Sequence, residues 1–143
     1  MPPAIEFSAD PSRLERDRVH AWLAEESYWA TGRSREAHDA AIDGSRNYGV
    51  YDTVTGEQLA YARVITDGVT FAWLCDVFVA NEARGRGVGV ALVEGVIDEL
   101  APLDLKRIAL TTADAHGLYE RFGFGPLDQP EQWMARPGTI GAS

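Results

Sequence analysis

The alternation of apolar and polar positions is clearest between residues 71 and 100. Residues 71–79 form an apolar run with a single charged side chain, which predicts a strand buried on both faces. After a short polar turn, apolar residues return at helical spacing and predict an amphipathic helix over residues 88–100. Its expected buried stripe consists of Val88, Ala91, Leu92, Val93, Val96, Ile97 and Leu100. We expect the rest of the chain to pack around this strand–turn–helix unit.

The residues before this unit predict two helices and an antiparallel meander. Asp10 followed by Pro11 is typical of a helix N-terminus, and Ser34 is a second candidate cap. Glycine-containing turns at 55–57 and 67–68 join neighbouring apolar segments, which favours antiparallel pairing. The expected elements are a strand at 5–8, helices at 11–26 and 35–43, and strands at 49–52 and 58–66.

The residues after the unit predict a strand, a helix and a tail. The strand at 106–111 is expected to run parallel to the strand at 71–79, because a helix connects the two. The helix at 114–122 places an apolar and aromatic stripe on one face, made of Ala115, Leu118, Tyr119 and Phe122. Glycine and small residues at 137–143 predict a frayed tail. This order of elements predicts one α/β domain over residues 1–143.

Composition limits the compartment and the partners. The chain has 22 acidic and 13 basic side chains and a net charge of −9, which disfavours nucleic acid and favours a cationic substrate. It shows no basic apolar leader and no apolar stretch of about 18 residues, so we expect a cytoplasmic protein that does not enter membranes. The single cysteine, Cys75, excludes an internal disulfide, and inside a buried strand its thiol is expected to be inert. We expect no metal site.

The turn between the central strand and helix has the composition of a phosphate site. Glycines alternate with Arg84 and Arg86 in the segment Arg-Gly-Arg-Gly-Val-Gly. Glycine lets a ligand approach the backbone, and the first N–H groups of a helix lack internal partners and attract anions. An exposed glycine-rich connection is the simpler alternative. The spacings of the P-loop and of Rossmann dinucleotide sites are absent, so an ATP- or NAD-binding enzyme is the less favoured hypothesis.

Two segments resemble signature motifs of the GCN5-related N-acetyltransferase (GNAT) superfamily. Arg84-x-x-Gly87-x-Gly89 is similar to its (Gln/Arg)-x-x-Gly-x-(Gly/Ala) signature, and the preceding residues 76–79 resemble its bulged fourth strand. Further along, residues 115–124 resemble its A-x-x-L-Y-x-(K/R)-x-G-F segment. The resemblance implies a mixed sheet of about six to seven strands, with the fourth and fifth parallel and splayed, flanked by about four helices.

This resemblance implies acetyl-CoA as the acetyl donor. In the family the pantetheine arm enters between the splayed strands, where a bulge frees backbone groups to pair with it, and the diphosphate lies on the glycine turn. The implied coenzyme contacts are Val77, Phe78, Val79, Arg84, Gly85, Arg86, Gly87, Val88, Gly89, Val90 and Thr112. Thr112 stands where the family often has asparagine, a departure that concerns this one contact.

The resemblance also implies direct acyl transfer to a primary amine through a tetrahedral intermediate. Tyr119 matches the family tyrosine that protonates the departing thiolate, although its helical stripe is also compatible with a core aromatic. The backbone N–H of Val77 at the bulge is expected to stabilise the oxyanion. Asp76, the carboxylate on the apolar strand, is a possible base, and a structural partner for an arginine is the alternative. His116 and a water chain are further candidates for the base.

The sequence leaves the acceptor open between a small-molecule and a peptide amine. Candidate wall residues are Tyr28, Trp29, Arg33, Trp73 and Trp133, each also compatible with a core position. Aromatic side chains beside an acidic surface suit a cation or an aromatic amine, whereas Arg33 or Arg35 suits a carboxylate. A homodimer is possible, since relatives of this kind are commonly dimeric. The alternative function is an acyl-CoA-binding sensor that does not turn the cofactor over.

Overall fold

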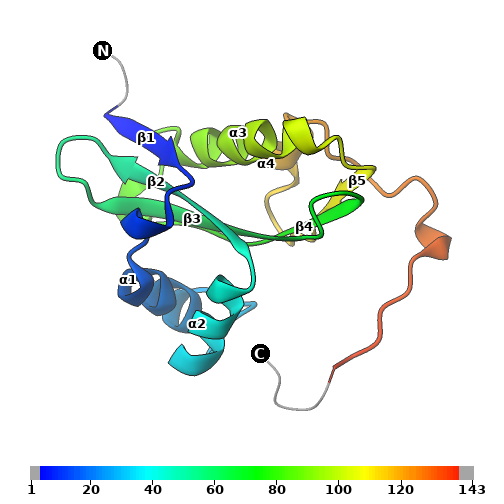
Figure 1. Ribbon diagram of the computed structural model, residues 1–143, viewed down its shortest axis with the longest axis horizontal. Coiled ribbons are helices and arrows are strands. Elements are labelled where there is room, and N and C mark those ends of the chain that lie inside the picture. Colours follow the sequence, from blue (N-terminus) through cyan, green and yellow to red (C-terminus); the bar gives the residue numbers. More distant parts are fainter. Residues whose placement is uncertain (1–3, 139–143) are drawn as a thin grey trace.

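One five-stranded sheet runs through the described part of the chain, residues 4–138 of this computed structural model (Figure 1). The strands are β1 (Ile5–Ser8), β2 (Arg46–Asp52), β3 (Gln58–Thr66), β4 (Phe71–Val79) and β5 (Arg107–Ala109). They lie side by side in sequence order, with β1 to β4 antiparallel to their neighbours and β5 parallel to β4. The predicted meander and the predicted parallel pair are therefore confirmed.

The number of strands differs from the expectation. About six to seven strands were expected, but within residues 4–138 the chain adds no strand after β5. Pro126 and Pro130 lie in this segment and lack the N–H group that a ladder needs, and Pro130–Gln132 form a 3-10 turn. Of the predicted tail, Pro137 and Gly138 are exposed and belong to no element, and residues 139–143 lie outside the described residues.

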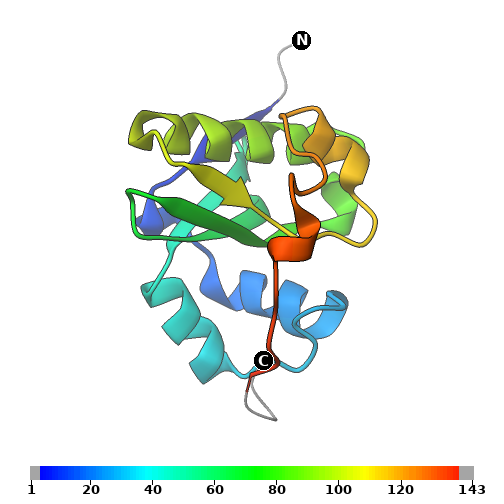
Figure 2. The ribbon, with the colours of Figure 1, turned by 90° about the vertical axis from the view of Figure 1, so that its right-hand side faces the viewer.

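Helices cover both faces of the sheet (Figures 1 and 2). Along one face α3 (Val88–Leu100) packs against β1, β2 and β3, with α4 (His116–Glu120) beside it. The other face is covered by α1 (Arg16–Ala21) and α2 (Arg35–Asp43). In the described residues no helix combines the length and the apolar character needed to cross a bilayer.

The central unit builds the core largely as its pattern predicts. On α3 the buried residues are Val88, Leu92, Val93, Val96 and Leu100, with Ala91 and Ile97 partly buried beside them. Burial along β4 alternates: the even positions from Ala72 to Phe78 are buried and the odd positions are partly exposed. The prediction of burial on both faces therefore holds only in part, because the odd positions are partly buried rather than buried.

The first predicted helix, over residues 11–26, is broken in the structure. Its pieces are a 3-10 turn at Pro11–Arg13, then α1, then a π-helical stretch at Trp22–Glu26. At the break, the backbone N–H of Glu15 donates to the side-chain carbonyl of the fully buried Gln58 at 2.8 Å, and the Glu15 carboxylate accepts from the Gln58 backbone. This exchange satisfies the Glu15 N–H, which an unbroken helix would pair internally, together with the N–H of Gln58 at the start of β3. No local pattern predicts it, because the partners lie far apart in the sequence.

Gly95 provides a test of how closely α3 packs on the sheet. A Cβ at Gly95 would lie 2.2 Å from Cδ2 of Phe7 on β1, whose ring stacks on Tyr48. Overpacking costs about 1–3 kcal/mol, more than the gain of about 1 kcal/mol that alanine brings to a helix. We therefore expect Gly95→Ala to lower the melting temperature. Gly117→Ala in α4 is the matched control, since a Cβ there meets nothing within 4 Å and should maintain or raise the melting temperature. Equal effects of the two changes would contradict the packing.

Candidate active site

A β-bulge interrupts the pairing of β4 with β3. The flanking pairs are Tyr61–Phe78 and Arg63–Cys75. Between them two residues of β4, Asp76 and Val77, face the single residue Ala62 of β3. Asp76 has a φ of 52°, a left-handed conformation that aspartate adopts more readily than most side chains. The bulge turns peptide groups of β4 out of the ladder, as the resemblance of residues 76–79 implies.

β4 and β5 separate as they approach this bulge. Their parallel pairing covers only Phe71–Trp73 against Arg107–Ala109. Beyond Trp73 the edge of β4 that faces β5 has no strand partner among residues 4–138. An extended ligand can hydrogen bond to such an edge as an added strand would. The splayed parallel pair that the resemblance implies is therefore present.

A cavity of about 840 Å³ lies beside the second half of β4. Its walls come mainly from β4, the turn before α3, the residues around the start of α4 and the loop before α2. The predicted site residues that line it are Tyr28, Trp29, Arg33, Trp73, Asp76, Val77, Phe78, Val79, Arg84, Gly85, Gly87, Val88, Gly89, Val90, Thr112 and Tyr119. The fold thus brings candidates from both halves of the chain to one site.

The turn before α3 presents backbone N–H groups to this cavity. Gly85 and Gly87 have φ values of 84° and 76°, a region that favours glycine, and a Cβ at either would meet nothing within 4 Å. Gly87 is the N-cap residue of α3, and no side chain within residues 4–138 caps this helix. The first amides of α3 are therefore available to an anion, and the helix dipole adds partial positive charge there.

The two arginines of the turn occupy different positions. Arg84 lines the cavity, whereas Arg86 does not and instead lies with Nη2 3.6 Å from Oδ2 of Asp52. Thr112 lines the cavity, and its hydroxyl accepts a hydrogen bond from the Ala115 N–H at 3.0 Å. All the predicted coenzyme contacts except Arg86 thus lie on the cavity wall.

Tyr119 is a buried residue of the cavity wall. It is 7% exposed and packs edge-on against Phe124, with ring centroids 5.8 Å apart. Burial, with smaller contributions from Tyr28 and Asp114, raises the pKa of Tyr119 to about 12. The phenol therefore keeps its proton at neutral pH, as a proton donor must. The Tyr28 hydroxyl accepts a hydrogen bond from the Ala113 N–H at 3.2 Å, which joins the loop before α2 to the segment before α4.

The carboxylate of Asp76 is surrounded by N–H donors. Its Oδ2 accepts from Arg33 Nη1 at 2.7 Å and from Arg63 Nε at 2.9 Å, and its Oδ1 accepts from Trp29 Nε1 at 3.0 Å. Burial alone would raise the pKa of Asp76, but the hydrogen bonds from the two arginines outweigh it and hold the pKa below its usual value. Such a carboxylate is a weak base. This geometry fits the structural alternative, in which the carboxylate holds arginines in place.

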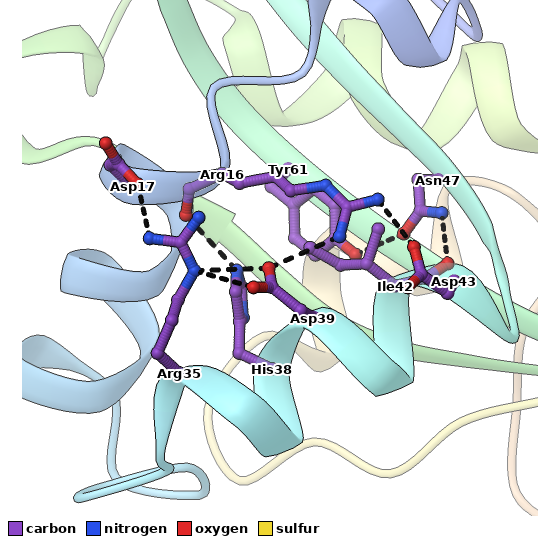
Figure 3. Close-up of polar contacts among 9 residues, drawn as sticks. All are labelled: Arg16, Asp17, Arg35, His38, Asp39, Ile42, Asp43, Asn47 and Tyr61. Carbon is purple, nitrogen blue, oxygen red and sulfur yellow. Dashed lines mark hydrogen bonds and ion pairs between the residues drawn. The ribbon is translucent and has the colours of Figure 1, made fainter.

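Arg33 is positioned by the segments on either side of it. Gly32 turns the chain with a φ of 77°, and the Arg33 carbonyl lies 2.7 Å from Nε2 of His20. Directly after it, α2 is joined to α1 by three ion pairs (Figure 3), which are Arg16–Asp39, Arg16–Asp43 and Arg35–Asp17. A fourth pair, Arg35–Asp39, lies within α2 and connects the other three. Arg35 therefore belongs to this network and lies outside the cavity.

The far end of α2 is tied to the sheet. The hydroxyl of Tyr61 on β3 donates to the side-chain carbonyl of Asn47, whose amide donates to the carbonyl of Ile42 at 2.9 Å (Figure 3). Tyr61 is fully buried beneath α2. Both ends of α2 are thus fixed, which holds the loop that carries Trp29 and Arg33 over the cavity.

Arg63 lines the cavity and donates to Asp76, and sequence reasoning did not single it out. Arg63 is a charged side chain within the apolar strand β3, and a buried guanidinium needs a partner. This pattern could have indicated that Arg63 pairs with a carboxylate. Cys75 also lines the cavity, and burial raises the pKa of its thiol to about 11, which agrees with an inert side chain. Two candidates lie elsewhere. Trp133 lies under the Arg107 guanidinium at 5.2 Å. His116 lines a second cavity of about 560 Å³ beside β5, which shares Thr111, Thr112 and Tyr119 with the first.

Comparison with known proteins identifies the family. The model of the acetyltransferase (GNAT) family matches residues 16–124, which is well over half of the chain. This protein belongs to that family. It is accordingly an acyltransferase.

The relatives of this GNAT protein agree with the assignment. A crystal structure of a GNAT family member from Xanthomonas campestris pv. campestris, provisionally assigned as an acetyltransferase, is 41% identical with a TM-score of 0.89, and the match covers 95% of this chain and 94% of that one. A Gibberella zeae protein with a provisional acetyltransferase assignment is 29% identical over 78% of this chain and 73% of its own length. N-acetylglutamate synthase from Neisseria gonorrhoeae, complexed with coenzyme A and N-acetyl-glutamate, shares the fold at 18% identity and a TM-score of 0.68, over 89% of this chain and 30% of that one.

Asp76→Asn tests whether the bulge of this GNAT protein depends on the buried carboxylate. Asparagine also adopts the left-handed conformation, so the change removes the charge and preserves the backbone fit. Removing one partner of a buried ion pair typically costs about 3–5 kcal/mol. We expect urea denaturation at neutral pH to show a loss of that size in the free energy of unfolding. Asp98→Asn, on the exposed side of α3, is the control and should change it little.

The pH dependence of this loss distinguishes charge from packing. Because the folded pKa of Asp76 is lowered, its stabilising contribution is present above the unfolded value of about 4 and disappears as the pH falls through the folded value. The difference between wild type and Asp76→Asn should therefore shrink as the pH is lowered below about 4. A difference that stays constant down to acidic pH would contradict the ionic role.

Proposed function

We propose that this protein transfers an acetyl group from acetyl-CoA to a primary amine. The observation that carries the proposal is that one cavity holds the uncapped N-terminus of α3, the free edge of the bulged β4 and the buried phenol of Tyr119. When bound, acetyl-CoA supplies an activated thioester. We further propose the cytoplasm as its compartment, because a single cysteine suits a reducing environment.

The residues around the turn fit the phosphates of coenzyme A. A diphosphate must approach the backbone closely, and Gly85 and Gly87 leave open space where other residues carry a side chain. The first amides of α3 supply hydrogen-bond donors, and Arg84 adds a fixed positive charge. Peptide groups of β4 near Val77 and Val79 suit an extended arm. The coenzyme A complex of the neisserial enzyme with the same fold supports the same ligand here.

Arg84→Ala and Arg86→Ala form a matched pair for testing the cofactor site. Each removes one positive charge from the same turn, but only Arg84 lines the cavity. Loss of a charge-assisted hydrogen bond costs about 1.5–3 kcal/mol, so calorimetry should show at least about tenfold weaker coenzyme A binding for Arg84→Ala. Arg86→Ala should have a clearly smaller effect, through long-range charge alone. Absence of coenzyme A binding to the wild-type protein would overturn the proposed function.

Tyr119 is the proposed general acid, and it donates its proton to the sulfur of the departing thiolate. Its raised pKa keeps the proton in place until that charge develops. The Val77 N–H, released from the ladder by the bulge, donates to the oxygen on which negative charge accumulates. Asp76 acts as a positioning residue that holds the bulge and its two arginines.

No side chain is assigned as the base that deprotonates the incoming amine. Asp76 accepts hydrogen bonds from Trp29, Arg33 and Arg63, which stabilise its ionised form and make it a poor proton acceptor. His116 is exposed on α4 and is not among the residues that line the cavity beside β4. We propose that the proton passes to solvent water, which has access through the open side of the cavity.

Tyr119→Phe tests the general acid. Phenylalanine keeps the ring and its packing against Phe124 but cannot donate a proton. We expect thiol release to slow at least tenfold, about 1.4 kcal/mol, while calorimetry shows nearly unchanged coenzyme A affinity. Tyr48→Phe is the control, because Tyr48 is equally buried but lies against Phe7, away from the cavity. If the coenzyme binds but no amine raises thiol release above background, the sensor alternative replaces the enzyme proposal.

A further inference from the structure

The polar cluster at the loop side of the cavity carries more positive than negative charge. It consists of Arg33, Arg63 and Asp76, whose side chains are 8%, 12% and 3% exposed. Both guanidiniums stay protonated, and the lowered pKa of Asp76 keeps its carboxylate ionised. Two cations therefore share one anion, and one positive charge is left without a counter-ion inside this nearly buried cluster.

Several N–H groups of the two arginines remain available. Together they make four hydrogen bonds, three to Asp76 and one from Arg63 Nη1 to Ser45 Oγ at 3.0 Å. Throughout residues 4–138 no fully buried side-chain nitrogen or oxygen lacks a hydrogen bond. Arg33 Nε and Arg63 Nη2 take part in none of these four bonds, so they reach space that solvent can enter. Both arginines line the cavity, so we infer that these are the donors that a ligand there would meet.

The other charges on the cavity wall do not balance this cluster. Glu26 is exposed and accepts a hydrogen bond from Asn81 at 3.2 Å, outside the cluster. Asp114 is exposed and lies near Tyr119, at the cofactor end. Burying a charge without a partner is costly, so an excess guanidinium beside an open cavity indicates a site built for an anion. The surrounding chain, with a net charge of −9, does not attract anions by its overall field.

We propose that the acetyl acceptor is an amine that also carries a carboxylate, which Arg33 and Arg63 bind. This inference rests on the proposed acetyl transfer and specifies its substrate class. A guanidinium matches a carboxylate with two parallel hydrogen bonds, which favours this anion. The exposed rings of Tyr28 and Trp29, packed edge-on at 4.9 Å, form the adjoining wall and receive the apolar part of the acceptor. A simple alkylammonium ion would instead face two guanidiniums.

Pairs of amines that differ only in the carboxylate test this assignment. Phenylalanine is compared with phenethylamine, and tryptophan with tryptamine, by thiol release at saturating acetyl-CoA. We expect kcat/KM to be at least about tenfold higher for the carboxylated member of each pair, as loss of a charge-assisted hydrogen bond predicts. A second measurement requires no turnover: calorimetry should show N-acetylphenylalanine binding more tightly than N-acetylphenethylamine.

Arg63→Gln shows whether the arginines cause the preference. It removes the excess charge and leaves Asp76 paired with Arg33, so the buried carboxylate keeps a counter-ion. We expect KM for phenylalanine to rise at least about tenfold and KM for phenethylamine to change little. Arg46→Gln is the control, because it also removes one arginine charge but from an exposed side chain of β2, which pairs with Val64 and so lies on the opposite face of the sheet from Arg63. If Arg63→Gln does not fold, Arg63→Lys, which keeps the charge but not the fork, should show a smaller loss of the same preference.

Each outcome decides the proposal. Acetylation of the decarboxylated amines with equal or higher kcat/KM would overturn the acceptor assignment and leave the proposed acetyl transfer intact. Equal weakening by Arg63→Gln and Arg46→Gln would reduce the effect to general charge and would also overturn it. If coenzyme A fails to bind and no amine of any kind is acetylated, the proposed function fails, and the acceptor assignment fails with it.

Discussion

The site depends on one buried ion cluster at a bulge in the central strand. Asp76 sits in a left-handed conformation, and its carboxylate joins β4 to Arg63 of β3 and to Arg33 from the loop before α2. A bulge alone changes the direction of a strand, but the arginines make this one a junction between the sheet and the loop. The same residue thus fixes the exposed peptide groups of β4 and the position of the aromatic loop over the cavity.

The side of the cavity where we propose that the cofactor binds is organised around α3 by a different constraint. Backbone amides bind a diphosphate only if nothing else caps them and if the ligand can come close, and both conditions are met at Gly87. The buried stripe of α3 holds the helix against β1, β2 and β3, so its N-terminus has a fixed place relative to the bulge. The two halves of the site therefore share the sheet as their common support.

The sequence predicted the elements whose cause is local. The apolar stripe of α3, the meander and the glycine turn follow from spacing and residue type, and the motifs 84–89 and 115–124 predicted the family to which the chain belongs. What it did not predict depends on contacts between distant residues. Gln58 accepts a hydrogen bond from Glu15 at the break in the first helix, although the two residues lie far apart in the sequence. Arg63 donates to Asp76 from a neighbouring strand. A charged residue in an apolar strand predicts that the residue has a partner, because an unpaired buried charge is costly. The sequence does not predict which residue is the partner or that a cavity lies beside the pair.

The distribution of charge along the cavity predicts how the proposed acceptor is oriented within it. Arg33 and Arg63 supply positive charge at the loop side, while the carboxylate of Asp114 lies near Tyr119 at the other side. An amine that carries a carboxylate is a dipole at neutral pH, and it aligns in such a field with its carboxylate towards the guanidiniums. Its nitrogen then faces the Tyr119 side, where we propose that the thiolate departs. The arginines would thus orient the nucleophile as well as select it, and a nucleophile already held in the reactive geometry loses less entropy on the way to the transition state.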